Sequence, residues 1–192
     1  MTGRLPAGAL LDESELAVEV GVDPPVVREA LCFLQRDGFV REEDGGRFSV
    51  TAPDEMELRE TYPVVLLLEG LAVRSTGTYP RDTLARLREI NADMQRDAGD
   101  PGAAAIHDHA FHEELVRNCG NEQLLATVRP LKRLLLRYEL TYLSERRNVG
   151  RSVSQHAEIV DALERGDCEG AAALVEANFR DALPELLHQL SE

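Results

Sequence analysis

From residue 54 to the C-terminus, apolar residues recur at helical spacing almost without a break. Six helices are predicted there, and no internal repeat or low-complexity tract is visible. Antiparallel helices pack into a bundle, at whose centre side chains from different helices meet. The prolines at 63, 130 and 184 are expected to start, bend or interrupt their helices. The predicted helices cover residues 54–76, 81–96, 101–118, 122–145, 153–165 and 168–190.

Before Pro53 the pattern changes to two short helices and a β-hairpin. Asp12 is expected to cap a helix over 13–20 that ends at Gly21. Asp23 is expected to cap a second helix, with Pro24 in its first turn. The hairpin is predicted at Phe39-Val40 and 47–50, with its turn at 44–46. The predicted inner faces are Leu16, Ala17 and Val20 in the first helix, and Val26, Val27, Ala30, Leu31 and Leu34 in the second. The fold class is therefore mainly α, with a winged helix-turn-helix at 1–53 and an antiparallel all-helical bundle at 54–192.

The net charge limits what the chain can bind without specific contacts. It has 35 acidic and 21 basic residues, which gives a net charge of −14, and residues 1–53 hold 5 Arg against 10 Asp or Glu. Such an excess repels polyanions. Any contact with DNA must therefore come from a few well-placed arginines.

The cysteines and the apolar runs indicate a soluble protein of the cytoplasm. Cys32, Cys119 and Cys168 are odd in number and lack CxxC spacing, so reduced thiols are expected. The most apolar run, 64–68, is far too short to span a bilayer, and the first residues lack the apolar core of a signal peptide. No membrane partner is expected.

The N-terminal pattern alone fits two helices that merely pack, but a longer string is more specific. The residues that carry it are Leu5-Pro6-Ala7-Gly8-x-Leu10, Glu15-Leu16-Ala17, Gly21-Val22, Val27-Arg28-Glu29-Ala30-Leu31 and Asp37-Gly38-Phe39-Val40. This string resembles the DNA-reading segment of the GntR family of transcription regulators. The resemblance implies binding to operator DNA, with Arg28 on the recognition helix and Arg47 at the wing.

Two departures from the family bear on DNA binding. The family opens with another helix before Leu-Pro-Ala-Gly, and this sequence begins only four residues earlier, so the first helix is expected to be lacking. Where the family has an arginine with hydroxyl neighbours that contact DNA, this sequence has Asp23-Pro24-Pro25. A carboxylate there points negative charge towards phosphates. Weak, strongly salt-dependent DNA binding is therefore expected.

A candidate metal site lies in the segment 107–112. On a helix, Asp108 and His112 are four residues apart and lie on one face, where they can hold one ion. Phe111 and Leu115 would shield that face. The pair alone also fits a solvated surface pair or a core histidine, because such spacings arise often by chance.

The wider pattern resembles the FCD domain of GntR-family regulators. It comprises Asp108-x-x-Phe111-His112, Leu115, Gly120-Asn121, Leu124, and the later run from His156 through Ile159, Ala162 and Gly166-Asp167 to Ala171. The resemblance implies a divalent ion, zinc or nickel, bound by an aspartate and three histidines. Asp108, His112 and His156 match three of those positions, and Asn178, 22 residues after His156, occupies the fourth. Its amide oxygen is a poorer ligand than imidazole for these metals. His107, His109 and His188 are expected to face solvent, with His109 as a possible substitute ligand.

The resemblance also implies a small-molecule effector, typically a carboxylate. The family's effector-binding arginine on the first bundle helix falls on Val65. Arg133 and Arg137 are the remaining candidates for holding an anion, unless they lie along the bundle surface. The apolar first bundle helix offers a surface to bury, and the family places two DNA readers on two half-sites, so a homodimer is expected.

Three functions are compatible with these features. The first is a ligand-responsive transcription regulator with metal-assisted sensing of an organic acid, and not an enzyme. The second is a metal-dependent enzyme on a helical bundle, because two histidines and one carboxylate also describe a non-haem iron oxygenase site. No motif supplies the base or cosubstrate anchor that an oxygenase needs. The third is a ligand-binding module that has lost DNA binding.

Overall fold

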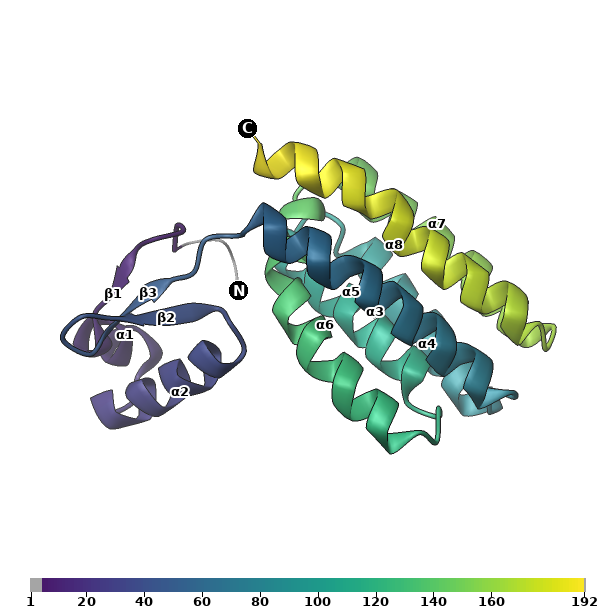
Figure 1. Cartoon of the computed structure of the whole chain (residues 1–192), viewed down its shortest axis with the longest axis horizontal. Coiled ribbons are helices and arrows are strands. Elements are labelled where there is room, and N and C mark those ends of the chain that lie inside the picture. The colour runs from purple at the N-terminus through teal and green to yellow at the C-terminus, as the bar shows by residue number, and fades with distance from the viewer. Residues whose placement is uncertain (1–4, 192) are drawn as a thin grey trace. The chain divides into compact units, whose positions relative to one another are not determined.

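A computed structural model of the chain describes residues 5–191 (Figure 1). It separates into two compact units, with the division between Pro53 and Asp54. Each unit has its own apolar core. Within residues 5–191, no helix is both long enough and apolar enough to cross a membrane.

The N-terminal unit combines two helices with a small antiparallel sheet whose strand order is β1-β3-β2. The Asp12 carboxylate caps the first helix by accepting hydrogen bonds from the backbone N–H groups of Ser14 and Glu15, as the sequence predicted. Gly21 ends that helix at a φ of 72°, a conformation that a β-carbon would strain. The elements are β1 (Leu10–Leu11), α1 (Glu13–Val20), α2 (Pro24–Arg36), β2 (Val40–Glu43) and β3 (Arg47–Val50).

Several details of this unit differ from the sequence-based expectations. Asp23 stands at the N-cap position of α2, but its side chain makes no capping hydrogen bond. Val20, Val26 and Ala30 were expected to face inward and are exposed. The unit is so small that its helices bury only a narrow stripe, and the strand β1 adds to the core from a segment with no strand pattern. The buried residues are Leu11, Ala17, Val27, Leu31, Val40 and Phe48.

The described residues of the C-terminal unit form the six predicted helices around one core. The helix α3 packs along α8 and α6, and α7 packs against α8 and α4. These helices are α3 (Glu55–Thr76), α4 (Arg81–Arg96), α5 (Pro101–Val116), α6 (Glu122–Tyr142), α7 (Arg146–Glu164) and α8 (Cys168–Leu190).

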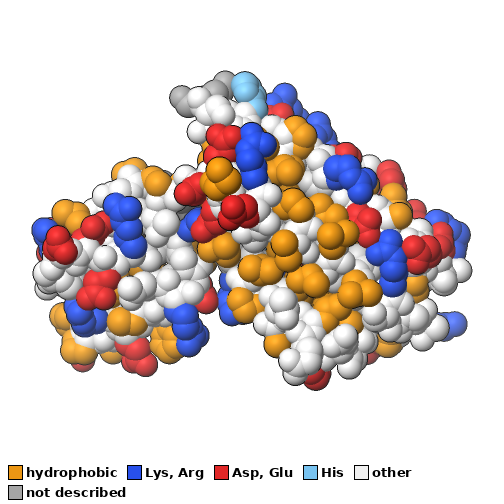
Figure 2. Space-filling model, viewed as in Figure 1, with side chains coloured by type: hydrophobic (Ala, Val, Ile, Leu, Met, Phe, Trp, Pro, Cys, Tyr) orange, Lys and Arg blue, Asp and Glu red, His pale blue; other side chains and the backbone are white. Residues whose placement is uncertain are grey.

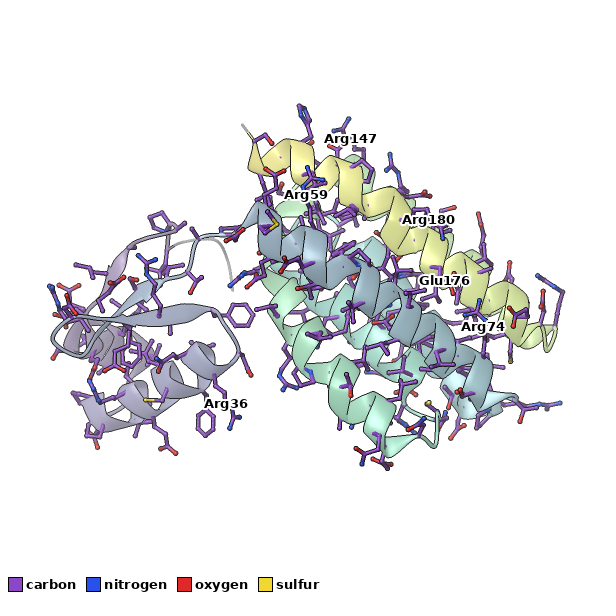
Figure 3. The ribbon with its side chains drawn as sticks, viewed as in Figure 1. Arg36, Arg59, Arg74, Arg147, Glu176 and Arg180 are labelled. Atoms are coloured by element: carbon purple, nitrogen blue, oxygen red, sulfur yellow. The ribbon has the colours of Figure 1, made fainter. Side chains whose placement is uncertain are left out.

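A glycine on α3 makes room for an ion pair between α3 and α8. A β-carbon at Gly70 would lie 2.6 Å from Glu176 Oε1 on α8, closer than non-bonded atoms approach. Glu176 also accepts a hydrogen bond from Arg74 on α3, at 2.7 Å between Nη1 and Oε1. Figure 3 shows these two side chains directed towards one another between the two helices. The absence of a side chain at position 70 therefore leaves room for this ion pair between the two helices.

The helix boundaries differ from prediction mainly at α7. This helix begins at Arg146, seven residues before the predicted start, and buries Asn148 and Val149. Gly150 weakens the helical pattern of this stretch, and burial of its neighbours outweighs that cost of about 1 kcal/mol. The prolines at 63, 130 and 184 do not interrupt their helices, since each lies inside a continuous one.

Candidate metal centre

Three potential metal ligands meet in the core of the C-terminal unit. Asp108 and His112 come from α5 and His156 comes from α7, and all three are buried. One ligand atom from each lies within 4.8 Å of the others. The Asp108 carboxylate lies 3.5 Å from His156 Nε2 and 4.0 Å from His112 Nε2. The spacing on α5 therefore does place both of its residues towards one point, where His156 joins them.

The hydrogen bonding of His156 fits a metal ligand. Both of its ring nitrogens are buried, and neither has a hydrogen-bond partner. A buried polar group left unpaired costs roughly 1–3 kcal/mol. Coordination of a cation by one of these nitrogens would remove that penalty, so the residues present fit a metal ion.

Aromatic rings hold the two histidines in place. Phe111 stacks on His156, with ring centroids 3.8 Å apart and planes 4° apart. Phe179 from α8 meets His112 edge-on at 5.0 Å. Phe111 thus lies against the site, as its position in the motif predicted, and Phe179 covers it from another helix.

Asn178 lies beside the three ligands. It is buried on α8, and its side chain lies close to His112. Its Nδ2 donates to Gln155 Oε1 at 2.9 Å. Because Nδ2 is engaged with Gln155, the amide oxygen is the atom of Asn178 that is suited to coordinate a cation.

Three buried charged residues that the sequence analysis missed surround the ligands. Glu69 Oε2 lies 2.5 Å from His112 Nδ1. Lys132 donates to Glu139 at 2.7 Å, and its Nζ lies 3.9 Å from Glu69 Oε1. The sequence did carry a signal for two of them. Lys132 and Glu139 are seven residues apart, on the same stripe of α6 as buried Leu125, Val128, Leu135 and Tyr142.

Burial shifts the ionisation of these groups strongly. Burial lowers the pKa of His112 and His156 well below the usual value, so both rings are neutral and offer a lone pair. Burial raises the pKa of Glu69 to about 7, and burial together with Glu139 raises the pKa of Asp108 to about 8. For Lys132, burial opposes the charge, but the neighbouring carboxylates outweigh it and raise its pKa.

The charge balance of this cluster favours a cation. Three carboxyl groups are buried here, those of Glu69, Asp108 and Glu139. Lys132 supplies one positive charge against them. When all are ionised, two negative charges remain uncompensated among these four side chains. A divalent cation would neutralise them, and buried charges are stable only when they are paired.

The remaining histidines lie apart from these ligands. His107 was predicted to face solvent, but it is partly buried and pairs with Asp97 at 3.0 Å between Nε2 and Oδ2. His109 is also partly buried, with Nδ1 inaccessible and without a hydrogen-bond partner. His188 is exposed, as predicted.

The predicted effector-binding residues have other surroundings. Arg137 forms an ion pair with Glu57 and donates to the hydroxyl of Tyr138 at 3.1 Å. Glu57 precedes Glu69 by twelve residues on α3, which is roughly 18 Å of helix. Arg133 is partly buried on α6, and Val65 is fully buried.

In the N-terminal unit, Arg28 is engaged within the unit. Its guanidinium pairs with Glu13 at 2.5 Å and donates to the backbone carbonyl of Gly46 at 3.2 Å. It also lies over the ring of Phe48, at 5.6 Å from the centroid. Arg28 therefore links both helices to the wing, while Arg47 is exposed at the start of β3.

Comparison with known families assigns both units. Residues 1–50 match the family of bacterial regulatory proteins called gntR, and residues 60–181 match the FCD domain. The chain belongs to the GntR family and carries an FCD domain. Among curated relatives, a probable D-xylose utilization operon transcriptional repressor of Paenarthrobacter nicotinovorans is 29% identical, with 97% of this chain and 83% of the relative covered. A gluconate operon transcriptional repressor of Bacillus licheniformis is 26% identical, covering 98% and 76%.

Solved structures show the same fold for this GntR-family chain. A putative GntR regulator from Rhodococcus sp. RHA1 has a TM-score of 0.80 at 24% identity, covering 97% of this chain and 91% of that one. The E. coli protein McbR/YncC has a TM-score of 0.76 at 19% identity, covering 98% and 91%. The predicted fold class and the predicted family are both confirmed. The chain is a DNA-binding transcriptional regulator, and the enzyme alternative is set aside because its relatives are regulators.

Proposed function

We propose that the FCD domain of this regulator senses a small organic acid with the help of a divalent metal ion, zinc or nickel. Asp108, His112 and His156 would hold the ion, with the amide oxygen of Asn178 as a fourth ligand. The observation that carries this proposal is His156, whose two buried ring nitrogens have no hydrogen-bond partner. When bound, the ion would supply a positive charge that attracts an effector's oxygen atoms.

The acid itself is proposed from the relatives and from the predicted arginines. One relative is named for a gluconate operon, and gluconate is a carboxylate. The effector's carboxylate would be met by Arg133 or by Arg137, and Arg137 would first have to leave Glu57. The effector would change operator affinity only if it binds one arrangement of the two DNA-binding units more tightly than another.

Metal content and thermal stability test the metal site. An ion that binds only the folded state stabilises it by about 2.7 kcal/mol when its free concentration is 100 times Kd. We expect zinc or nickel to raise the melting temperature of the wild type, and His112→Ala and His156→Ala each to abolish this rise. His188→Ala, on an exposed histidine, is the matched control. Equal melting temperatures for wild type and both variants, with and without a chelator, would rule the site out.

We also propose that the regulator is a homodimer that buries part of α3. Val64, Leu67 and Leu71 follow one another at helical spacing and are 44%, 60% and 48% exposed. Figure 2 shows hydrophobic side chains gathered on this face of the helical unit. Contiguous apolar surface of this kind marks interaction sites. A second copy is the proposed partner, because two half-sites of an operator require two readers.

Sedimentation at micromolar concentration tests the dimer. We expect twice the mass of the chain for the wild type, and the mass of one chain for Leu67→Glu, since a charge in the centre of the stripe would be buried without a partner. Ile106→Glu is the control, because Ile106 is equally exposed (54%) but lies on α5. A wild type that sediments as a monomer would refute this proposal.

A further inference from the structure

A continuous series of buried charged groups leads to one side of the metal centre. It starts at Glu139, which accepts from Lys132 at 2.7 Å. Lys132 lies 3.9 Å from Glu69, and Glu69 lies 2.5 Å from Nδ1 of His112. The four side chains come from α6, α3 and α5, and none is more than 6% exposed. Removing these charges from water costs free energy, so we looked for a function that this arrangement serves.

The contact with Glu69 determines which nitrogen of His112 is free. A neutral imidazole carries its proton on one nitrogen and a lone pair on the other. When the Glu69 carboxylate accepts a hydrogen bond from Nδ1–H, the proton of the ring stays on Nδ1 and the lone pair is on Nε2. Nε2 is the atom directed towards Asp108, at 4.0 Å. The ammonium group of Lys132 lies 3.9 Å from the other oxygen of Glu69, so Oε2 is the oxygen that faces the ring.

The second histidine lacks such a partner. Neither ring nitrogen of His156 has a hydrogen bond, and its ring is held by stacking on Phe111. The two histidines are therefore fixed by different means. Changes at Glu69 should act on the ion through His112 and leave His156 as it is.

We propose that Glu69 is a positioning residue of the metal centre, which fixes the Nδ1-protonated form of His112 and directs Nε2 at the ion, while Lys132 and Glu139 hold Glu69 in place. This inference rests on the proposed metal binding. Outer carboxylates of this kind typically change metal affinity by about 10–100-fold when they are removed.

Competition with a chelator, using zinc and nickel in turn, measures the effect. Glu69→Leu removes the acceptor, and we expect its affinity to fall by about 10–100-fold. Glu69→Gln keeps an oxygen that can accept from Nδ1–H, and we expect a smaller loss, of about tenfold or less. The control is Glu176→Gln, which removes a charge beside α3 but pairs with Arg74 instead of His112. Circular dichroism identifies variants that fail to fold, and if Glu69→Leu is one of them, Glu69→Gln decides.

A second readout does not depend on metal. The ¹⁵N chemical shifts of His112 in the metal-free protein report which ring nitrogen carries the proton. We expect Nδ1 to carry it in the wild type and a mixture of both forms in Glu69→Leu or Glu69→Gln. If the wild type binds metal and the folded Glu69 variants match it in affinity, the inference is wrong and the proposed function stands. If the wild type binds neither ion, the proposed function fails, and the ¹⁵N shifts alone decide whether Glu69 fixes the ring.

Discussion

The FCD domain buries a cluster of charged side chains, whereas the ion pairs described in the winged helix-turn-helix lie at its surface. The side chains of Lys132 and Glu139 are 2% and 6% exposed, and those of Arg28 and Glu13 are 48% and 26% exposed. An exposed ion pair contributes little, because water and salt screen it. A buried pair must stay complete, because a single remaining charge has no solvent around it. Buried charge thus surrounds a candidate site in the FCD domain, whereas the Arg28–Glu13 pair joins two helices at the surface of the winged helix-turn-helix.

The largest expected effect tests this difference directly. Lys132→Met should destabilise the FCD domain by about 3–5 kcal/mol, because it leaves buried carboxylates without a partner. Arg28→Met should cost at most about 1 kcal/mol, since its ion pair is exposed. Urea unfolding followed by circular dichroism measures both. If the two variants lose similar amounts of unfolding free energy, the buried Lys132 contributes no more to stability than the exposed Arg28.

A smaller effect is expected from completing the ligand set. Asn178→His would place a third imidazole beside His112, and we expect zinc or nickel to bind about 10–100-fold more tightly, the range known for changes in the surrounding shell. The imidazole is bulkier than the amide, so the effector response should weaken. Competition with a chelator measures the affinity. A folded variant with unchanged affinity would mean that position 178 does not reach the ion.

The smallest effect is expected at the DNA reader. Asp23→Ser combined with Pro24→Arg removes a negative charge and adds a positive one at the start of α2. Each added phosphate contact should steepen the plot of log affinity against log salt by about one unit. Glu158→Arg changes the net charge equally on an exposed part of α7 and is the control. If the double variant and the control behave alike on a matched operator, this loop does not contact DNA.

The helical fold could be predicted well, because helical spacing is a local property of the sequence. The bounds of α4 and α8 agree with prediction, and the errors fall where tertiary contacts decide. The early start of α7, with Asn148 buried, is one such case. The exposure of Val26 is another, because the sequence pattern overstates how much of α2 so small a unit can cover.

The metal ligands and their charged surroundings differ in how far they could be predicted. Asp108 and His112 share one helix, so their spacing offered a candidate pair, and the resemblance to the FCD domain added His156 and Asn178. Glu69 directly follows the apolar run 64–68, and in the structure it is buried against His112. Single charges inside apolar stripes indicate a buried partner, but the identity of that partner depends on how helices pack. For that reason the sequence could indicate that Lys132 and Glu139 are buried, but only the structure shows that they lie beside Glu69 and His112.

The position of Gly70 next to Glu69 has a consequence for the metal site. Gly70 leaves room for the Glu176 side chain of α8, and the residue before it, Glu69, contacts His112. Asn178 on α8 contacts the same ring. A change that moves α8 away from α3 would therefore move Asn178 and Glu69 apart, although both lie against the ring of His112. Gly70→Ala would push the side chains of Glu176 and Arg74 aside, one residue from Glu69, and metal affinity would show how far that displacement reaches.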